Sequence, residues 1–169
     1  ILTPHNPAAI AIAGGPRTVA FTPDQRFAYV LTQNESTITA FDYEPLSATL
    51  TFIESVPATP NGGSFSAHLV VHESGKFLYA SNRMDNGIAL FSIDPQTGQL
   101  SEIAQHREML NFPRLFAIDP TGELMLIGNQ HDNSVALRRI DPQTGELTAV
   151  GTPLSVPPEP TFVGILSIP

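Results

Sequence analysis

Cysteine is absent from this chain of 169 residues, and basic residues are scarce. Without cysteine there can be no disulfide, no thiolate nucleophile and no zinc–thiolate site. The absence fits a reducing compartment, and we predict the cytoplasm. Only 8 Lys and Arg residues stand against 16 Asp and Glu, which gives a net charge of −8. That charge repels phosphate backbones and anionic bilayers, so we expect neither nucleic acid nor a membrane as a partner.

Long apolar runs are also missing. None approaches the roughly 20 residues that span a bilayer, and no basic segment precedes an apolar one, as a signal peptide requires. The chain begins at Ile1, so we expect a processed N-terminus or residues upstream. No convincing helical period is visible. Hydrophobic residues make up 41% and charged residues 14%, which indicates a globular domain.

The sequence contains an internal repeat. Three segments superimpose: residues 16–44, 66–98 and 113–145. The turn DPQTG occurs twice, at 94–98 and again 47 residues later. In the second repeat, four apolar strands alternate with turns rich in Asp, Asn, Pro and Gly. Four strands in every 40–50 residues indicate β-propeller blades. A β-sandwich is the alternative, although sandwich strands need not repeat in sequence.

We therefore predict an all-β fold, a single domain over 1–169 that is part of a seven-bladed β-propeller. Its predicted parts are the last strand of a preceding blade at 1–12, blades at 16–60, 66–107 and 113–151, and a strand at 161–168 that closes the ring. Three blades with two orphan strands leave open sheet edges, which invite pairing. We expect a fragment, a nicked product or one half of a complex, without a stable closed monomer. N-terminal blades on the same or a separate chain would complete the ring.

The chain resembles the lactonase-type seven-bladed propellers, over its length from about Gly14 to Pro169 and in their C-terminal half. This family includes propeller-type 6-phosphogluconolactonases and 3-carboxymuconate lactonizing enzymes. The motifs that carry the resemblance are Gly15-Pro16-Arg17, Phe77-Leu78-Tyr79-Ala80-Ser81-Asn82-Arg83, Phe112-Pro113-Arg114, Gly128-Asn129-Gln130, both DPQTG turns and Val156-Pro157-Pro158-Glu159-Pro160. The resemblance implies an anionic lactone at one mouth of the central channel. Arginines there hold its carboxylate or phosphate, and a carboxylate or histidine handles the proton.

Carried over by motif, the family's site arginines are Arg17 and Arg83. Two positions depart from the family. Thr18 follows Arg17 where the family often has histidine, and Gln33 stands where the family has glutamate. An amide cannot accept a proton as a general base. Glu35 could substitute only if its turn is rearranged, and the family's further active-site histidine lies upstream of this chain.

The repeat alignment groups the candidate residues into two sets. The first set is Arg17, Ala67 and Arg114, and the second is Gln33, Arg83 and Gln130. Equivalent positions in a propeller surround one axis, so each set predicts a ring near the channel. The planar guanidinium suits carboxylate or phosphate. Alternatively, the arginines tie neighbouring blades together through backbone carbonyls or acids. We assign catalysis to Arg17, Arg83 and Gln33, and substrate binding to His68, Arg114 and Gln130.

Other motifs have plainer interpretations. His68 and His72 have the spacing of a helical zinc pair, but on a strand they would lie about 13 Å apart, too far for one metal. His68 is either a site residue or a satisfied polar residue of an inner strand. Residues 85–87 and 132–133 could be weak calcium ligands, but hairpin turns are the favoured interpretation. We expect no metal and no cofactor.

Three functions remain open at this point. They are hydrolysis of an anionic sugar lactone of the 6-phosphogluconolactonase type, carboxymuconate-type cycloisomerisation, and non-catalytic binding of a small acid or a protein. Fold alone cannot choose among them. Arg17 and Arg83 favour an enzyme, whereas Thr18 and Gln33 favour binding without turnover. Lactone hydrolysis is the function we favour.

Overall fold

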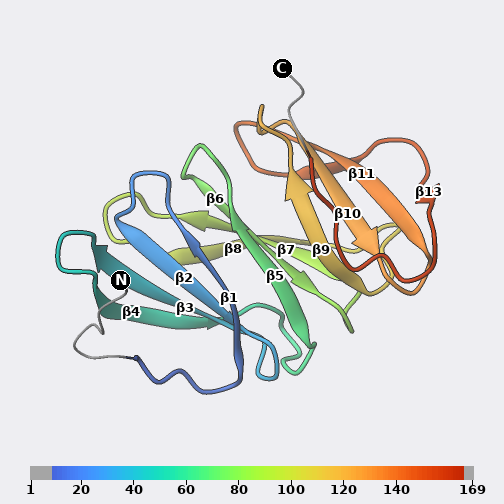
Figure 1. Ribbon diagram of the computed structural model, residues 1–169. Coiled ribbons are helices and arrows are strands. Elements are labelled where there is room, and N and C mark those ends of the chain that lie inside the picture. The colour runs from blue at the N-terminus through green and yellow to red at the C-terminus, as the bar shows by residue number, and fades with distance from the viewer. Residues whose placement is uncertain (1–8, 166–169) are drawn as a thin grey trace, which may run out of the picture.

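A computed structural model describes residues 9–165, which form three antiparallel β-sheets (Figure 1). The first sheet contains β1 (Pro16–Phe21), β2 (Phe27–Thr32), β3 (Thr37–Glu44) and β4 (Thr49–Pro57). The second contains β5 (Ser66–Val71), β6 (Phe77–Asn82), β7 (Gly87–Ile93) and β8 (Leu100–His106). The third contains β9 (Pro113–Ile118), β10 (Leu124–Asn129), β11 (Ser134–Ile140) and β12 (Leu147–Ala149), and β13 (Leu154–Ser155) also pairs with β11. Across 9–165, no helix could cross a membrane.

The strands β1–β4, β5–β8 and β9–β12 follow chain order within their sheets. Each sheet is thus built on a four-stranded meander, and each meander falls inside one of the three predicted blade ranges. Strand β13, the fifth strand of the third sheet, lies beyond the predicted range 113–151. Turns rich in Asp, Asn and Gly join strands rich in Val, Ile, Phe and Tyr, as the repeat requires. The predicted all-β, blade-built fold is confirmed.

The two predicted flanking strands have a different outcome. Residues 161–165 form no strand, because no sheet of the described range pairs with them, and 166–168 lie outside that range. Val163 instead packs over Gly128 of β10, where an added Cβ would lie 3.1 Å from the valine. Of the strand predicted at 1–12, residues 1–8 lie outside the described range and 9–12 form none.

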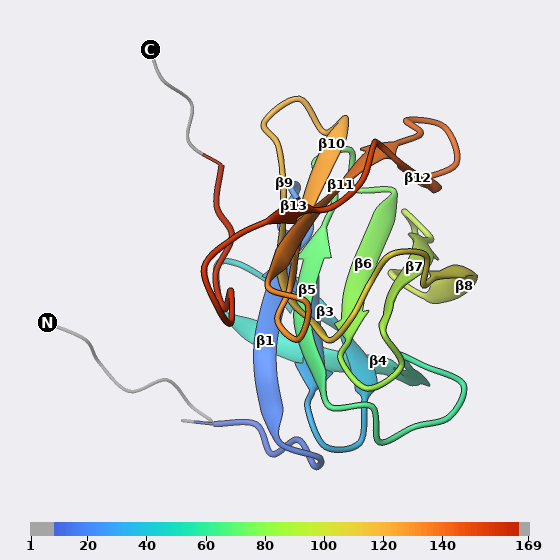
Figure 2. The ribbon, with the colours of Figure 1, turned by 90° about the vertical axis from the view of Figure 1, so that its right-hand side faces the viewer.

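The sheets stack face to face, with β1 beside β5 and β5 beside β9 (Figure 2). Side chains alternate between the two faces of each strand, so one sheet packs on two neighbours. Tyr29 and Leu78 belong to the buried cluster between the first two sheets. Tyr79 and Ile127 belong to the cluster between the second and third. Since both faces of the second sheet are covered, β6 is buried along its whole length.

The two DPQTG turns do more than reverse the chain. Each turn reaches back to the preceding blade, where a tyrosine hydroxyl donates a hydrogen bond to its glycine carbonyl. Tyr29 bonds to Gly98 at 2.9 Å, and Tyr79 bonds to Gly145 at 2.7 Å. The Cβ of any other residue at Gly98 would lie 2.4 Å from the Phe27 ring. We call this pairing of a DPQTG turn with the preceding blade's aromatic strand the turn contact.

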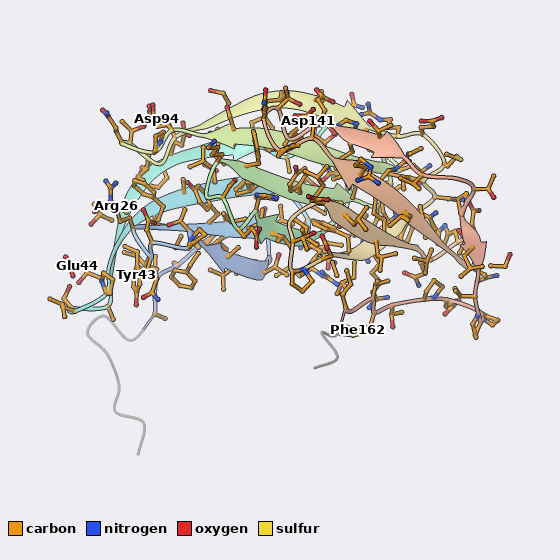
Figure 3. The ribbon with its side chains drawn as sticks, turned by 90° about the horizontal axis from the view of Figure 1, so that it is seen from above. Arg26, Tyr43, Glu44, Asp94, Asp141 and Phe162 are labelled. Carbon is orange, nitrogen blue, oxygen red and sulfur yellow. The ribbon has the colours of Figure 1, made fainter. Side chains whose placement is uncertain are left out.

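Two further hydrogen bonds join blades at the same end of the strands. The Arg26 guanidinium donates to the carbonyl of Pro95 at 3.0 Å, and Figure 3 shows Arg26 beside the turn that begins at Asp94. The His72 ring nitrogen Nε2 lies 2.9 Å from the Gly122 carbonyl oxygen. The end of the blades that carries these turns is thus an end where the blades are fastened together.

Candidate functional site

The first strand of every blade carries a β-bulge near its N-terminal end. The extra residue is Arg17 in β1 and Arg114 in β9, whereas the bulge of β5 takes in Ala67 and His68. Bulges interrupt the alternation of side chains and re-aim one of them, and they are common beside active sites. Because β1, β5 and β9 lie side by side (Figure 2), the bulges bring residues from three blades to one edge.

A left-handed residue precedes each of these strands. Gly15 has a φ of 71°, Phe65 of 50° and Phe112 of 54°. Such values are uncommon for residues other than glycine, and they concentrate at functional sites. At these positions the chain turns sharply into the strand. Two such residues accept hydrogen bonds from backbone N–H groups after the second strand: Gln33 donates to the Gly15 carbonyl at 2.8 Å and Gln130 to that of Phe112 at 3.2 Å.

The start of β5 gathers two arginines. Arg83 donates from Nε to the Phe65 carbonyl at 2.7 Å, and Arg17 donates from Nη1 to the Ala67 carbonyl. The Arg83 guanidinium also lies over the ring of Phe112, 5.3 Å from its centroid. Arg17 therefore ties the first blade to the second through a carbonyl, as one alternative from the sequence predicted. The same contacts fix the guanidinium groups at the edge formed by the three bulges.

Arg114 and Gln130 complete the group. Arg114 donates from Nη1 to the Gln130 side-chain oxygen at 3.4 Å. Burial, and then the positive charge of Arg114, lower the pKa of Arg17. Burial, followed by the charges of Arg17 and Arg114, lowers the pKa of Arg83. The three cations thus repel one another, and a bound anion would relieve that repulsion.

No acidic side chain among residues 9–165 pairs with Arg17, Arg83 or Arg114. The ion pairs of this range join His106 to Glu146, Arg138 to Glu108 and Arg139 to Glu123. A chain with a net charge of −8 therefore holds three uncompensated arginines at one place. Bidentate guanidinium groups arranged in this way suit a carboxylate or a phosphate.

His68 lies beside this arginine group. Its backbone N–H donates to the Ser81 hydroxyl at 3.0 Å, and its ring meets the Phe116 ring edge-on at 5.1 Å between centroids. Burial, and secondly the charge of Arg17, lower the pKa of His68 to about 4. The imidazole is therefore neutral around pH 7. His72, the other half of the sequence pair, faces Gly122 instead.

The remaining candidates lie around the group. Gln33 is half-buried and bound to the start of β1 through its backbone. Glu35 is exposed and lies across Gly14, where an added Cβ would meet its side chain at 2.8 Å. The Thr18 hydroxyl is buried, with no hydrogen-bond partner in the described part of the chain. The sequence did not indicate His131, which stacks on Phe112 at 3.9 Å and widens the aromatic surface beside Arg83.

Two sets of polar residues are structural. Asn82 accepts a hydrogen bond from Ser66 at 2.5 Å and donates to Ala58 at 2.7 Å, so it joins strands and a loop. Asn86 and Asn133 have φ values of 51° and 50°, which confirms the hairpin-turn interpretation of both Asp-Asn motifs. Over residues 9–165, no three His, Cys, Asp or Glu side chains come together as metal ligands would.

Comparison with known proteins gives the same architecture. The family model described as "Lactonase, 7-bladed beta-propeller" matches residues 2–165. A 6-phosphogluconolactonase of Bacillus subtilis (strain 168) is 32% identical over 124 residues, which cover 72% of this chain and 36% of the relative. A solved structure of a candidate 6-phosphogluconolactonase from Bacteroides fragilis superimposes with a TM-score of 0.87 at 31% identity, covering 94% of this chain and 44% of the other.

A second solved structure, the periplasmic gluconolactonase of Pseudomonas aeruginosa, gives a TM-score of 0.87 at 26% identity. It covers 98% of this chain and 47% of the other. This chain therefore spans less than half the length of each relative.

Proposed function

Because this chain belongs to the lactonase family of seven-bladed β-propellers, we propose that the whole protein hydrolyses an anionic sugar lactone such as 6-phosphogluconolactone. The observation that carries the proposal is the group of Arg17, Arg83 and Arg114, which comes from three blade repeats and has no acidic partner in residues 9–165. The name of the Bacillus relative supports a phosphorylated sugar lactone, and that of the Pseudomonas protein supports a sugar lactone more broadly.

The arginine group supplies what lactone opening needs from its surroundings. Attack of water on the lactone carbonyl creates an oxyanion, and positive donors held in place stabilise it. One guanidinium can hold the phosphate or carboxylate while another faces the developing charge. Arg83 is held against Phe65 and Phe112, so little reorganisation is needed during the reaction. Substrate and oxyanion are both negative, which matches the uncompensated charge.

Non-catalytic binding of a small acid is the second candidate function. Gln33 in place of a glutamate, and Thr18 in place of a histidine, favour it, because neither side chain exchanges a proton near pH 7. Carboxymuconate-type cycloisomerisation would use the same arginine group, but the reaction would close a lactone ring where hydrolysis opens one. The three functions differ in turnover and substrate, so one set of assays separates them.

The test is hydrolysis of 6-phosphogluconolactone by the whole protein, corrected for spontaneous opening. We expect Arg83→Ala to lower kcat/KM by about 10²-fold or more, the usual cost of removing an oxyanion donor. Arg139→Ala is the matched control, since Arg139 is exposed and pairs only loosely with Glu123 at 3.9 Å. Binding of 6-phosphogluconate without any turnover by the folded wild type would favour the non-catalytic candidate.

The remaining blades of the ring are the proposed partner of the first sheet. Its face away from the second sheet holds Ala28, Val30 and Phe41 as a small buried cluster. Nearby Phe52 is 63% exposed, and Val19 is 55% exposed. A preceding blade packed there would cover this apolar surface. For location, the cytoplasm remains our proposal on the absence of cysteine, and cell fractionation is its test.

A further inference from the structure

We infer that His68 is the proton-transfer residue of this site, in the place of the acid–base groups that Gln33 and Thr18 cannot supply. The inference rests on the proposed lactone hydrolysis. His68 is equivalent in the repeat to Thr18, one blade further along. The first blade has Thr18 where the family often has histidine, and the second blade has a histidine at the equivalent position.

The position of His68 and the chemistry of its side chain both support this role. His68 lies in the bulge of β5, one residue after Ala67 and three residues after Phe65. The carbonyls of Ala67 and Phe65 anchor Arg17 and Arg83. The charge of Arg17 also acts on the His68 ring, so an anion held by the Arg17 guanidinium would lie near the imidazole. Since Arg, Gln and Thr side chains do not exchange protons near neutral pH, His68 is the side chain of this group whose chemistry fits the task.

The charges around His68 explain how it would act. The first blade presents Arg17, the second presents Ser81, and the third presents Phe116, and none of these is an acid. The low pKa of about 4 keeps the imidazole neutral and ready to accept a proton. An anionic substrate bound to Arg17 offsets its charge, which moves the pKa upward and makes His68 a stronger base during the reaction.

In the proposed step, His68 acts first as a general base and then as a general acid. The neutral His68 imidazole takes one proton from water as the water oxygen bonds to the lactone carbonyl carbon. The resulting oxyanion faces a guanidinium. When it collapses, the bond from the carbonyl carbon to the ring oxygen breaks, and the imidazolium returns its proton to that oxygen, which leaves as a hydroxyl. The new carboxylic acid loses its proton to solvent, and His68 is again neutral.

The experiment compares His68→Gln with His106→Gln in the whole protein. Glutamine keeps the polarity of the side chain but transfers no proton. General acid–base catalysis is worth about 10²–10⁴-fold, so we expect kcat to fall at least about 10²-fold in His68→Gln while KM changes little. His106 lies on the outer strand β8 beside Glu146, at 3.3 Å, and serves as the control with unchanged kcat. Melting temperature and 6-phosphogluconate binding report whether each variant is folded.

Two more readouts separate chemistry from structure. The fall in wild-type kcat at acidic pH should vanish in His68→Gln, and added imidazole should restore part of the rate of His68→Ala. If the wild type turns over and His68→Gln retains its kcat, the inference is wrong and the lactonase proposal stands. If the folded wild type binds 6-phosphogluconate but shows no turnover of the lactone, both are wrong.

Discussion

Alanine at Gly145 should destabilise the protein through the turn contact, beyond any effect on the backbone. Gly145 has a φ of 76°, and an added Cβ would lie 2.8 Å from the Phe77 ring, which is only 5% exposed. A left-handed alanine costs about 1–2 kcal/mol. Forcing a buried ring aside costs a further 1–3 kcal/mol, approximately. We therefore expect Gly145→Ala to lower the free energy of unfolding by about 2–5 kcal/mol.

Gly151 provides the matched control for that substitution. It lies six residues further on, has a φ of 65°, and an added Cβ would meet nothing within 4 Å. Gly151→Ala should therefore cost only the backbone part, about 1–2 kcal/mol. Urea unfolding of the whole protein, followed by circular dichroism, measures both. Equal losses in the two variants would refute the steric reasoning. A Phe77→Leu change should recover part of the Gly145→Ala loss, as a double-mutant cycle would show.

Tyr79→Phe leaves the buried Gly145 carbonyl unpaired, so the free energy of unfolding should fall by about 1–3 kcal/mol, whereas Tyr43→Phe should change it little in the same denaturation assay. The unfolded chain protonates His68 below its ordinary pKa of 6.5 while the folded chain resists until about 4. The free energy of unfolding should therefore fall as the pH drops from 6.5 to about 4, and it should fall less steeply in His68→Gln. The same pH dependence in His68→Gln and the wild type would contradict this prediction. Added phosphate should raise the melting temperature more than an equal ionic strength of chloride, and Arg17→Ala should remove that difference.

The repeat predicted the blades because strand periodicity and turn residues are local signals. Strand β5 nevertheless begins at the polar Ser66, before the apolar stretch that hydrophobic patterning detects. Its polar start pairs across a bulge with β6, through the Ser81 hydroxyl, and hydrophobic patterning does not register such pairing. Strand β13 was missed because two residues carry no period. The strand expected at 161–168 needs a neighbouring strand, which sequence patterning does not supply.

The candidate site was predictable in its membership more than in its geometry. Aligning the repeats was enough to place Arg17 and Arg114 in one set of equivalent positions and Arg83 in a second set. The anchoring carbonyls of Phe65 and Ala67 were not predictable, because backbone acceptors leave no mark on residue type. The aromatic surface beside Arg83 depends on a left-handed Phe112, a conformation that residue type gives little reason to expect.

The turn contact always joins a later blade to an earlier one, which affects how the blades can dock during synthesis. Each DPQTG turn comes between the third and fourth strands of its own blade and reaches back to a blade synthesised earlier. A nascent blade can thus be fastened to its predecessor once the turn after its third strand has left the ribosome, before its fourth strand is made. Docking can therefore advance from the N-terminus toward the C-terminus in step with translation. Each new blade covers the apolar face of the last before the ring is complete, which limits the time that face is exposed to aggregation.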